Sequence, residues 1–152
     1  SYQKKHMSFQ SIGPDKINQL RHVRFLKDES GVMAMMKKHE IILKPKFETV
    51  LDILDKELGD LDEVSWNKPH GGYFISLFVA PGTAGEVVRL CKECGVELTP
   101  AGATYPYGND PEDRNIRIAP SYPPLEELIP AIGVLCISTK LAAARKALES
   151  LI

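Results

Sequence analysis

The sequence lacks the features that mark membrane, secreted and nucleic-acid-binding proteins. Its longest apolar runs, such as residues 73–80, are too short to span a bilayer, and its N-terminal stretch has no apolar signal-peptide core. Nineteen basic and twenty acidic side chains leave a formal net charge of -1. Nucleic acids and anionic membranes attract a basic surplus. We therefore expect neither a nucleic acid nor a membrane as a partner.

Cysteine and recognisable catalytic motifs are also scarce. Three cysteines, an odd number, predict free thiols in a reducing compartment, and we expect a cytoplasmic location. Cys91 and Cys94 form a CxxC pair, but both fall on the apolar stripe of an expected helix, and no second ligand pair follows. The sequence contains no P-loop and no evident Ser-His-Asp or Cys-His arrangement. We therefore predict no metal site.

What is present has the composition of a globular domain. Of the 152 residues, 43% are hydrophobic and 26% are charged, enough for one domain of ordinary size with a real core. Apolar residues at helical spacing predict a helix over residues 15–26 and further helix over 30–58, kinked or broken at Pro45. We expect residues 1–59 to form a long helical arm. Position 1 is serine, so we also expect the chain to lie within a longer gene product.

From residue 60 onward, strands and helices alternate. Short apolar stretches predict strands near residues 64–66, 73–79, 96–99 and 114–121. Thr83 and Glu86 have the spacing of a capping box, which predicts the start of a helix, and a last helix is expected over 124–151. The order β-β-α-β-β-α predicts an α/β (α+β) fold. We expect residues 60–152 to form a two-layer sandwich, with a mixed sheet of about four strands and helices on one face.

Arg117 is the candidate functional residue that the pattern itself indicates. Ile116 and Ile118 alternate with Arg117, so the guanidinium points away from the apolar face of the expected strand. Proline-rich loops flank this strand on both sides. A guanidinium pairs bidentately with a carboxylate, so this position suits holding one in a fixed orientation. The alternative is a solvated arginine, or one paired with a local acid such as Asp113.

Three stretches, taken in order, resemble the small domain of fold-type I pyridoxal-phosphate aminotransferases. Residues 69–74 (PHGGYF) resemble that family's Pro-x-Gly-Gly-(Tyr/Phe)-Phe strand opening. Residues 96–105 (VELTPAGATY) resemble its Val-x-(Val/Leu)-x-Pro-(x)-Gly-x-x-(Phe/Tyr) segment. Residues 115–121 (NIRIAPS) are similar to its arginine-containing strand. The sequences of residues 11–16 (SIGPDK) and 44–47 (KPKF) are most similar to the aspartate-aminotransferase-like branch of class I/II.

The resemblance implies a role for four residues and a reaction for the whole enzyme. Arg117 would bind the substrate α-carboxylate, Phe74 would pack near it, and Gly72 would leave room for the chain. Ser11 would lie near the cofactor phosphate of the neighbouring subunit and is the weaker candidate. The enzyme would be a homodimer that transfers an amino group between an amino acid, aspartate being one candidate, and a 2-oxo acid.

The same resemblance implies that much of the enzyme lies outside this chain. The large domain of the family carries the lysine that forms a Schiff base with pyridoxal 5′-phosphate, and no such segment is recognisable here. We therefore expect no catalytic residue in this chain, which would be inactive alone. Ala101-Gly102 replaces the family's Pro-Gly, which leaves the loop alignment open by one residue.

Two other functions remain open at this stage. A decarboxylase or a lyase can use the same cofactor on the same fold, because a fold does not specify a reaction. An aminotransferase-like domain that senses a ligand in a transcription regulator is the alternative outside enzymes.

Overall fold

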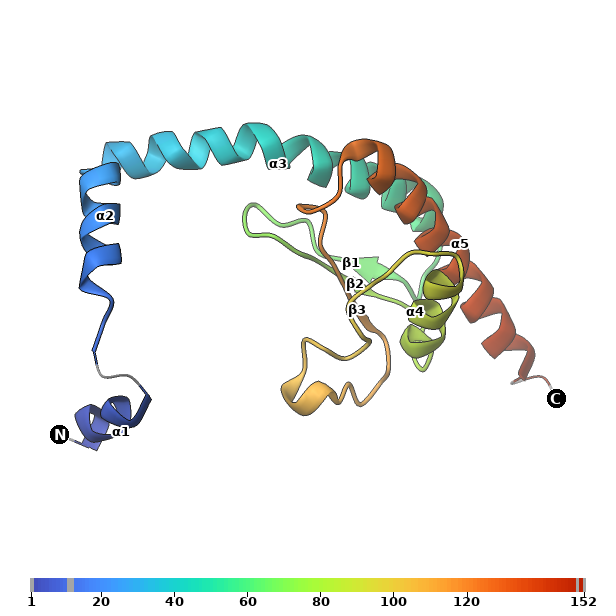
Figure 1. Ribbon diagram of the computed structural model, residues 1–152. Coiled ribbons are helices and arrows are strands. Elements are labelled where there is room, and N and C mark those ends of the chain that lie inside the picture. Colours follow the sequence, from blue (N-terminus) through green and yellow to red (C-terminus); the bar gives the residue numbers. More distant parts are fainter. Residues whose placement is uncertain (1, 11–12, 150, 152) are drawn as a thin grey trace. The chain divides into compact units, whose positions relative to one another are not determined.

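The structure is a computed structural model that describes residues 2–10, 13–149 and 151, and the chain divides into two compact units between Ile42 and Leu43. The first unit contains helices α1 (Tyr2–Gln10) and α2 (Lys16–Leu26) and the first part of α3 (Glu29–Leu58) (Figure 1). Asp15 caps α2 by accepting a hydrogen bond from the Asn18 amide at 3.0 Å. No residue of α2 is buried.

The second half of α3 belongs to the second unit. Its side chains Val50, Leu54 and Leu58 are fully buried in the core of that unit. The helical arm expected over residues 1–59 therefore overlaps the second unit, because these three side chains need apolar partners that the sheet and the other helices supply. α3 also continues through Pro45, so the break expected there as one of two outcomes does not occur. Ile41, whose carbonyl loses its helical partner at Pro45, is exposed to water.

The sheet has three described strands: β1 (Ser65–Trp66), β2 (Ile75–Phe78) and β3 (Asn115–Ile118). β1 and β3 both pair antiparallel with β2, so the expected mixed sheet of about four strands is corrected to a three-stranded antiparallel one in the described residues. Residues 96–99 do not join it. The Val96 amide donates instead to the Cys91 carbonyl at 2.8 Å, at the end of the preceding helix.

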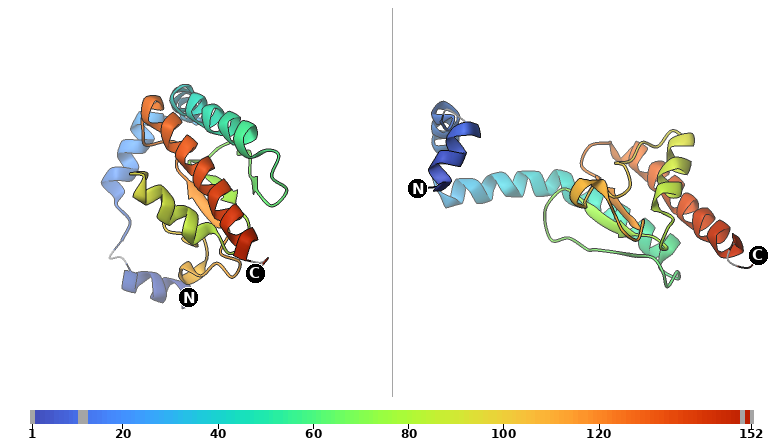
Figure 2. Two further views of the ribbon diagram at one scale, coloured as in Figure 1. Left: turned by 90° about the vertical axis from the view of Figure 1, so that its right-hand side faces the viewer. Right: turned by 90° about the horizontal axis from the view of Figure 1, so that it is seen from below.

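The helices cover one face of this sheet, and the α/β class is confirmed. α4 (Ala84–Glu93), α5 (Leu125–Glu149) and the second half of α3 lie alongside one another against the sheet (Figure 2, left). The core between the layers combines side chains from the strands and all three helices. It includes Leu54, Leu77, Val87, Ile116 and Leu135.

α5 is long enough and apolar enough to cross a membrane by length and composition alone, although the short apolar runs of the sequence predicted no such segment. Packing accounts for part of its apolar composition, whereas side chains such as Ile137 and Leu148 are exposed. Leu128, Ile132, Leu135 and Ala142 lie on its buried side, within the core of the second unit. An apolar helix of this length is also what a two-layer domain needs to cover its sheet.

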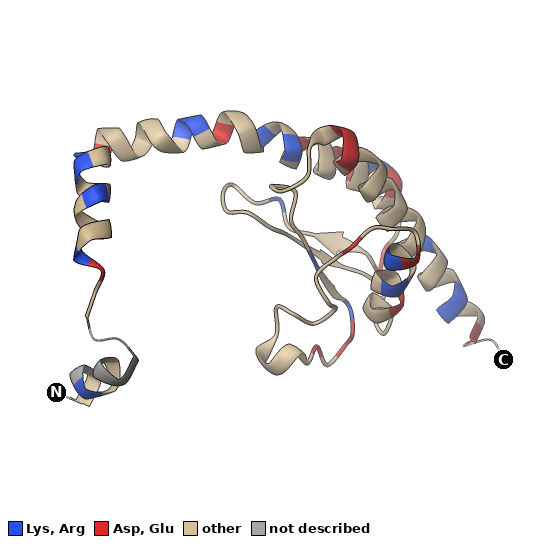
Figure 3. Ribbon diagram, in the orientation of Figure 1, with Lys and Arg blue, Asp and Glu red and all other residues tan. Residues whose placement is uncertain are grey.

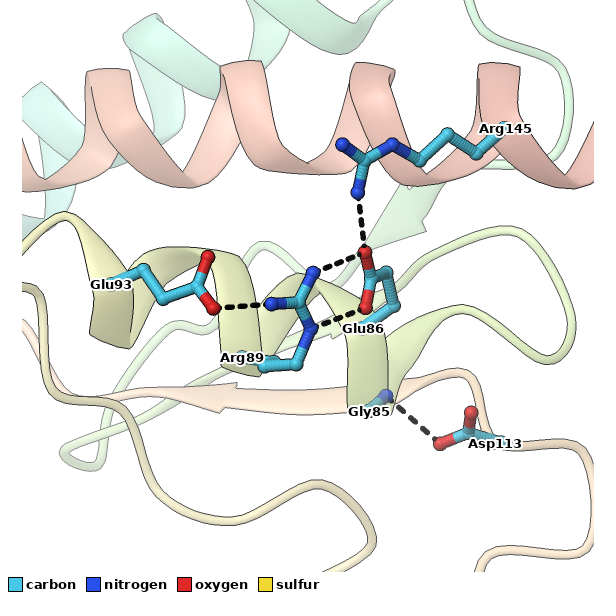
Figure 4. A network of polar contacts seen from close by, with 6 residues as sticks. All are labelled: Gly85, Glu86, Arg89, Glu93, Asp113 and Arg145. Carbon is cyan, nitrogen blue, oxygen red and sulfur yellow. Dashed lines mark hydrogen bonds and ion pairs between the residues drawn. The ribbon is translucent and has the colours of Figure 1, made fainter.

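The first turn of α4 is capped differently from the expected capping box. Thr83 does stand at the N-cap position, but its hydroxyl donates to the Ala80 carbonyl at 2.6 Å. The free amide of Gly85 donates instead to an Asp113 carboxylate oxygen at 3.1 Å (Figure 4). The chain before β3 therefore supplies the cap, and Asp113 is used at the N-terminus of α4.

Glu86, which was expected to complete the capping box, instead belongs to an ion cluster that links α4 to α5. Its carboxylate accepts hydrogen bonds from Arg89 Nε and Nη2, both at 2.7 Å, and from Arg145 Nη1 at 2.8 Å (Figure 4). Glu93 pairs with Arg89 from one turn further along α4. The pKa of Glu86 is lowered to about 2, first by the hydrogen bonds from Arg89 and then by the hydrogen bond from Arg145.

We predict that this cluster makes the acid stability of the domain depend on Glu86. Its pKa is lowered by folding, so its stabilising effect is complete above its ordinary value of 4.5 and is lost as the pH falls toward about 2. Replacing Glu86 by glutamine should lower the melting temperature at neutral pH, and the difference from the unmodified chain should disappear at the acid end. Thermal unfolding in steps of pH tests this. The same replacement at Glu97, an exposed acid outside the cluster, should not show that pattern.

We further predict that Leu54→Ala lowers the free energy of unfolding by about 3 kcal/mol, because a fully buried leucine leaves a cavity when it is truncated. The same change at Leu148, which is 61% exposed on α5, should stay within about 0.5 kcal/mol. Denaturant unfolding measures both values. Equal effects at the two positions would show that the second half of α3 is not part of the core.

Candidate functional site

Arg117 is the centre of the candidate site. It is the third residue of β3 and lies opposite Ser76 of β2 in the sheet register. Ile116 and Ile118 on either side of it are buried in the core, whereas Arg117 is only half-buried. The alternation of the strand therefore directs the guanidinium to the face that the helices do not cover.

Two neighbours hold the guanidinium in this position. Nη2 of Arg117 donates a hydrogen bond of 3.3 Å to the Thr99 hydroxyl. The ring of Phe74 lies against the guanidinium, with Cζ 4.4 Å from the ring centroid, which is a cation–π contact. Within the described part of the chain Arg117 forms no ion pair, and Asp113 caps α4 instead. The positive charge is therefore not neutralised by a local acid.

Phe74 and Gly72 come from the turn that leads into β2. Phe74 directly precedes the strand and is 46% exposed. Gly72 has φ of +90°, a conformation that favours glycine. A Cβ at Gly72 would meet no described atom within 4 Å, so the backbone conformation, not crowding, requires glycine here.

A buried asparagine ties the loop over residues 100–113 to the sheet beside Arg117. The Asn115 side chain donates to the Ser76 hydroxyl at 2.8 Å and accepts from the Thr104 hydroxyl at 2.5 Å. The backbone carbonyl of Asn115 accepts a hydrogen bond from the Gly102 amide at 3.5 Å. The apolar alternation of the sequence does not indicate this residue, although an amide at the start of a short strand is a signal of a specific hydrogen bond.

Asp110 closes the other end of that loop. Its carboxylate accepts hydrogen bonds from the backbone amides of Glu112, Arg114 and Asn115 at 3.1, 2.9 and 2.8 Å. Burial acts to raise the pKa of Asp110, but these backbone donors outweigh it and the pKa is lowered. The carboxylate stays charged and fixes the turn before β3.

The loop that follows β3 is held from α3. The ammonium group of Lys46 donates to the carbonyls of Ser121 and Pro123 at 2.9 and 2.7 Å. This contact joins residues more than seventy positions apart, and no local pattern in the sequence indicates it. Both loops that flank the Arg117 strand are thus fastened by specific polar contacts.

A pocket of about 580 Å³ opens next to Arg117. Its walls are the segment 94–99, the chain from Arg117 to Ala119, and the first half of α5. Its lining is largely apolar, and its residues with polar side chains include Arg117, Thr99, Tyr122 and the two acids Glu97 and Glu127. Arg117 is the one cation among the described residues of this lining, so a ligand carboxylate is expected to bind at the Arg117 end of the pocket.

The remaining candidates are not part of this site. Ser11 lies outside the described residues. Cys91 is buried, and burial raises the pKa of its thiol, whereas Cys94 is exposed, so the expected shared buried stripe holds for one of them only. Among the described residues, no three His, Cys, Asp or Glu side chains converge as metal ligands do.

Comparisons with known proteins agree with the fold. The family profile described as aspartate amino-transferase matches residues 1–150. An aspartate aminotransferase from Corynebacterium glutamicum is 50% identical over 139 residues, which are 91% of this chain and 32% of that protein. The chain thus spans about a third of the length of this relative.

Solved structures extend the comparison to three dimensions. An aspartate transaminase from Corynebacterium glutamicum superimposes with a TM-score of 0.86 at 49% identity, over 93% of this chain and 34% of that one. An α-aminoadipate aminotransferase from Thermus thermophilus, complexed with N-(5′-phosphopyridoxyl)-L-leucine, shares the fold with a TM-score of 0.65 at 22% identity, over 80% of this chain and 30% of that one. The profile match over nearly every residue shows that this chain belongs to the aspartate amino-transferase family.

Proposed function

We propose that this chain is the carboxylate-binding part of a pyridoxal-phosphate-dependent aminotransferase, with Arg117 as the residue that binds the substrate α-carboxylate. The observation that carries the proposal is a half-buried guanidinium stacked on Phe74 with no acid paired to it in the described residues. A charge in such a place is costly unless a partner arrives. A substrate carboxylate is a partner of the right charge and planarity.

The reaction is the transfer of an amino group between an amino acid, with aspartate as the proposed donor, and a 2-oxo acid. Both substrates carry a carboxylate next to the reacting carbon, so one arginine serves both. Pyridoxal phosphate, when bound, supplies the electron sink of this chemistry. Arg117 contributes orientation, because a bidentate pair fixes the torsion about the bond next to the carboxylate.

The residues described here fit the substrate side of such a site and not a cradle for the cofactor. Arg117 is held by a hydroxyl and an aromatic ring, and the pocket beside it is lined mostly by apolar atoms. A phosphate calls for several converging donors or a helix N-terminus. We therefore assign the lysine and most cofactor ligands to the two thirds of the enzyme outside this chain, and we expect this chain to be inactive alone.

The assembly and location of the enzyme stay predictions. A homodimer is implied by the resemblance in the sequence, and a cytoplasmic location by the three free cysteines. The charges give some support for a chain without a nucleic-acid partner. Figure 3 shows Lys and Arg interspersed with Asp and Glu along α3, α4 and α5.

We predict that Arg117→Lys lowers kcat/KM for L-aspartate in the full-length enzyme by roughly a hundredfold, because an ammonium group cannot replace two parallel hydrogen bonds. The matched control is Arg145→Lys on α5, which keeps a cation beside Glu86 of α4. This variant should leave kcat/KM within about twofold. Steady-state kinetics with a panel of amino acids measures both. Absorbance of bound pyridoxal phosphate should be the same in both variants. An unchanged kcat/KM in Arg117→Lys for every amino acid rules out the carboxylate role.

A further inference from the structure

We propose that Thr99 is a positioning residue for Arg117, which sets the rotation of the guanidinium so that its Nη1–Nη2 edge faces the substrate carboxylate. The proposal rests on the carboxylate role of Arg117 and names the group on which that role depends. Thr99 lies outside the sheet, in the segment between α4 and the loop over residues 100–113. Its hydroxyl accepts the 3.3 Å hydrogen bond from Nη2.

The atoms of Arg117 differ in what they offer a ligand. A guanidinium has five N–H donors and two edges that can hold a carboxylate bidentately, one formed by Nε with an Nη atom and the other by Nη1 with Nη2. Nε is buried and has no partner in the structure, so the first edge is closed. Nη1 also has no protein partner among the described residues, but it is not buried. The open edge is therefore Nη1–Nη2.

Phe74 alone cannot select that edge. A cation–π contact holds the guanidinium plane against the ring, but it depends weakly on how the plane is turned about its own normal. The hydrogen bond to Thr99 is directional and acts within that plane. The ring fixes the plane and the hydroxyl fixes the rotation, so the two contacts together define one orientation.

The Thr99 hydroxyl is itself held in place. A threonine side chain has few rotamers, and Pro100 restricts the backbone of the residue before it. Three and five residues further on, Gly102 and Thr104 are bonded to Asn115, which lies two positions before Arg117 on the same strand. The strand that carries the arginine thus also anchors the loop that begins next to Thr99.

A fixed arginine loses less freedom when a ligand binds, so the contact should strengthen binding without changing the chemical step. In the full-length enzyme with L-aspartate, Thr99→Val should raise KM by about five- to tenfold and leave kcat within about twofold. Valine keeps the shape of threonine and removes the acceptor. Thr99→Ser, which keeps the hydroxyl and removes the methyl group, should restore KM to within about twofold.

A role for Thr99 in packing alone gives the opposite order, with Thr99→Ser more harmful than Thr99→Val, and this result would overturn the proposal. A double-mutant cycle gives the second readout. In an Arg117→Lys background, Thr99→Val should have no further effect on KM, and equal effects in both backgrounds would also overturn it. If Arg117→Lys lowers kcat/KM but Thr99→Val leaves KM unchanged, only the role of Thr99 fails. If Arg117→Lys leaves kcat/KM unchanged as well, the carboxylate role of Arg117 fails too.

Discussion

The contact between the Arg117 guanidinium and the Phe74 ring is the interaction on which the candidate site depends. The arginine is half-buried on the face of the sheet that the helices leave open, and no carboxylate neutralises it in the described residues. An aromatic ring stabilises the cation without removing its charge, whereas an acid would remove both charge and binding capacity. The nearest acid in sequence, Asp113, is kept away because it caps α4.

The two loops around Arg117 are held by contacts of the same kind, in which a polar side chain bonds to backbone or hydroxyl groups. Asn115 and Asp110 fasten the preceding loop, and Lys46 fastens the following one. These contacts let irregular segments keep a defined position next to the strand. A binding site benefits, because a donor that is already oriented loses little freedom when the ligand arrives.

Much of the fold follows from periodicity. The helices over residues 16–26 and 125–149 and the strands around Ile75 and Ile116 lie where apolar spacing predicts them, because each must bury one face. The segment 96–99 also has the composition of a strand. It stays outside the sheet since Val96 bonds back to the end of α4, a choice that depends on where the helix ends in space. Thr83 likewise has the right spacing for a capping box, but the Gly85 amide in the first turn of α4 bonds to Asp113 instead.

By itself, the sequence determined the α/β class, the place of Arg117 on a strand between two loops, and its direction away from Ile116 and Ile118, because a period of two assigns neighbours to opposite faces. Its ordered motifs also indicated the family that the comparisons then showed. Only the tertiary structure decided what surrounds the guanidinium. Phe74, Thr99 and Arg117 come from three separate segments, and side chains so distant in sequence meet only when the chain has folded. Asp113 is close to Arg117 in sequence, but in the folded chain its carboxylate binds the Gly85 amide at the start of α4.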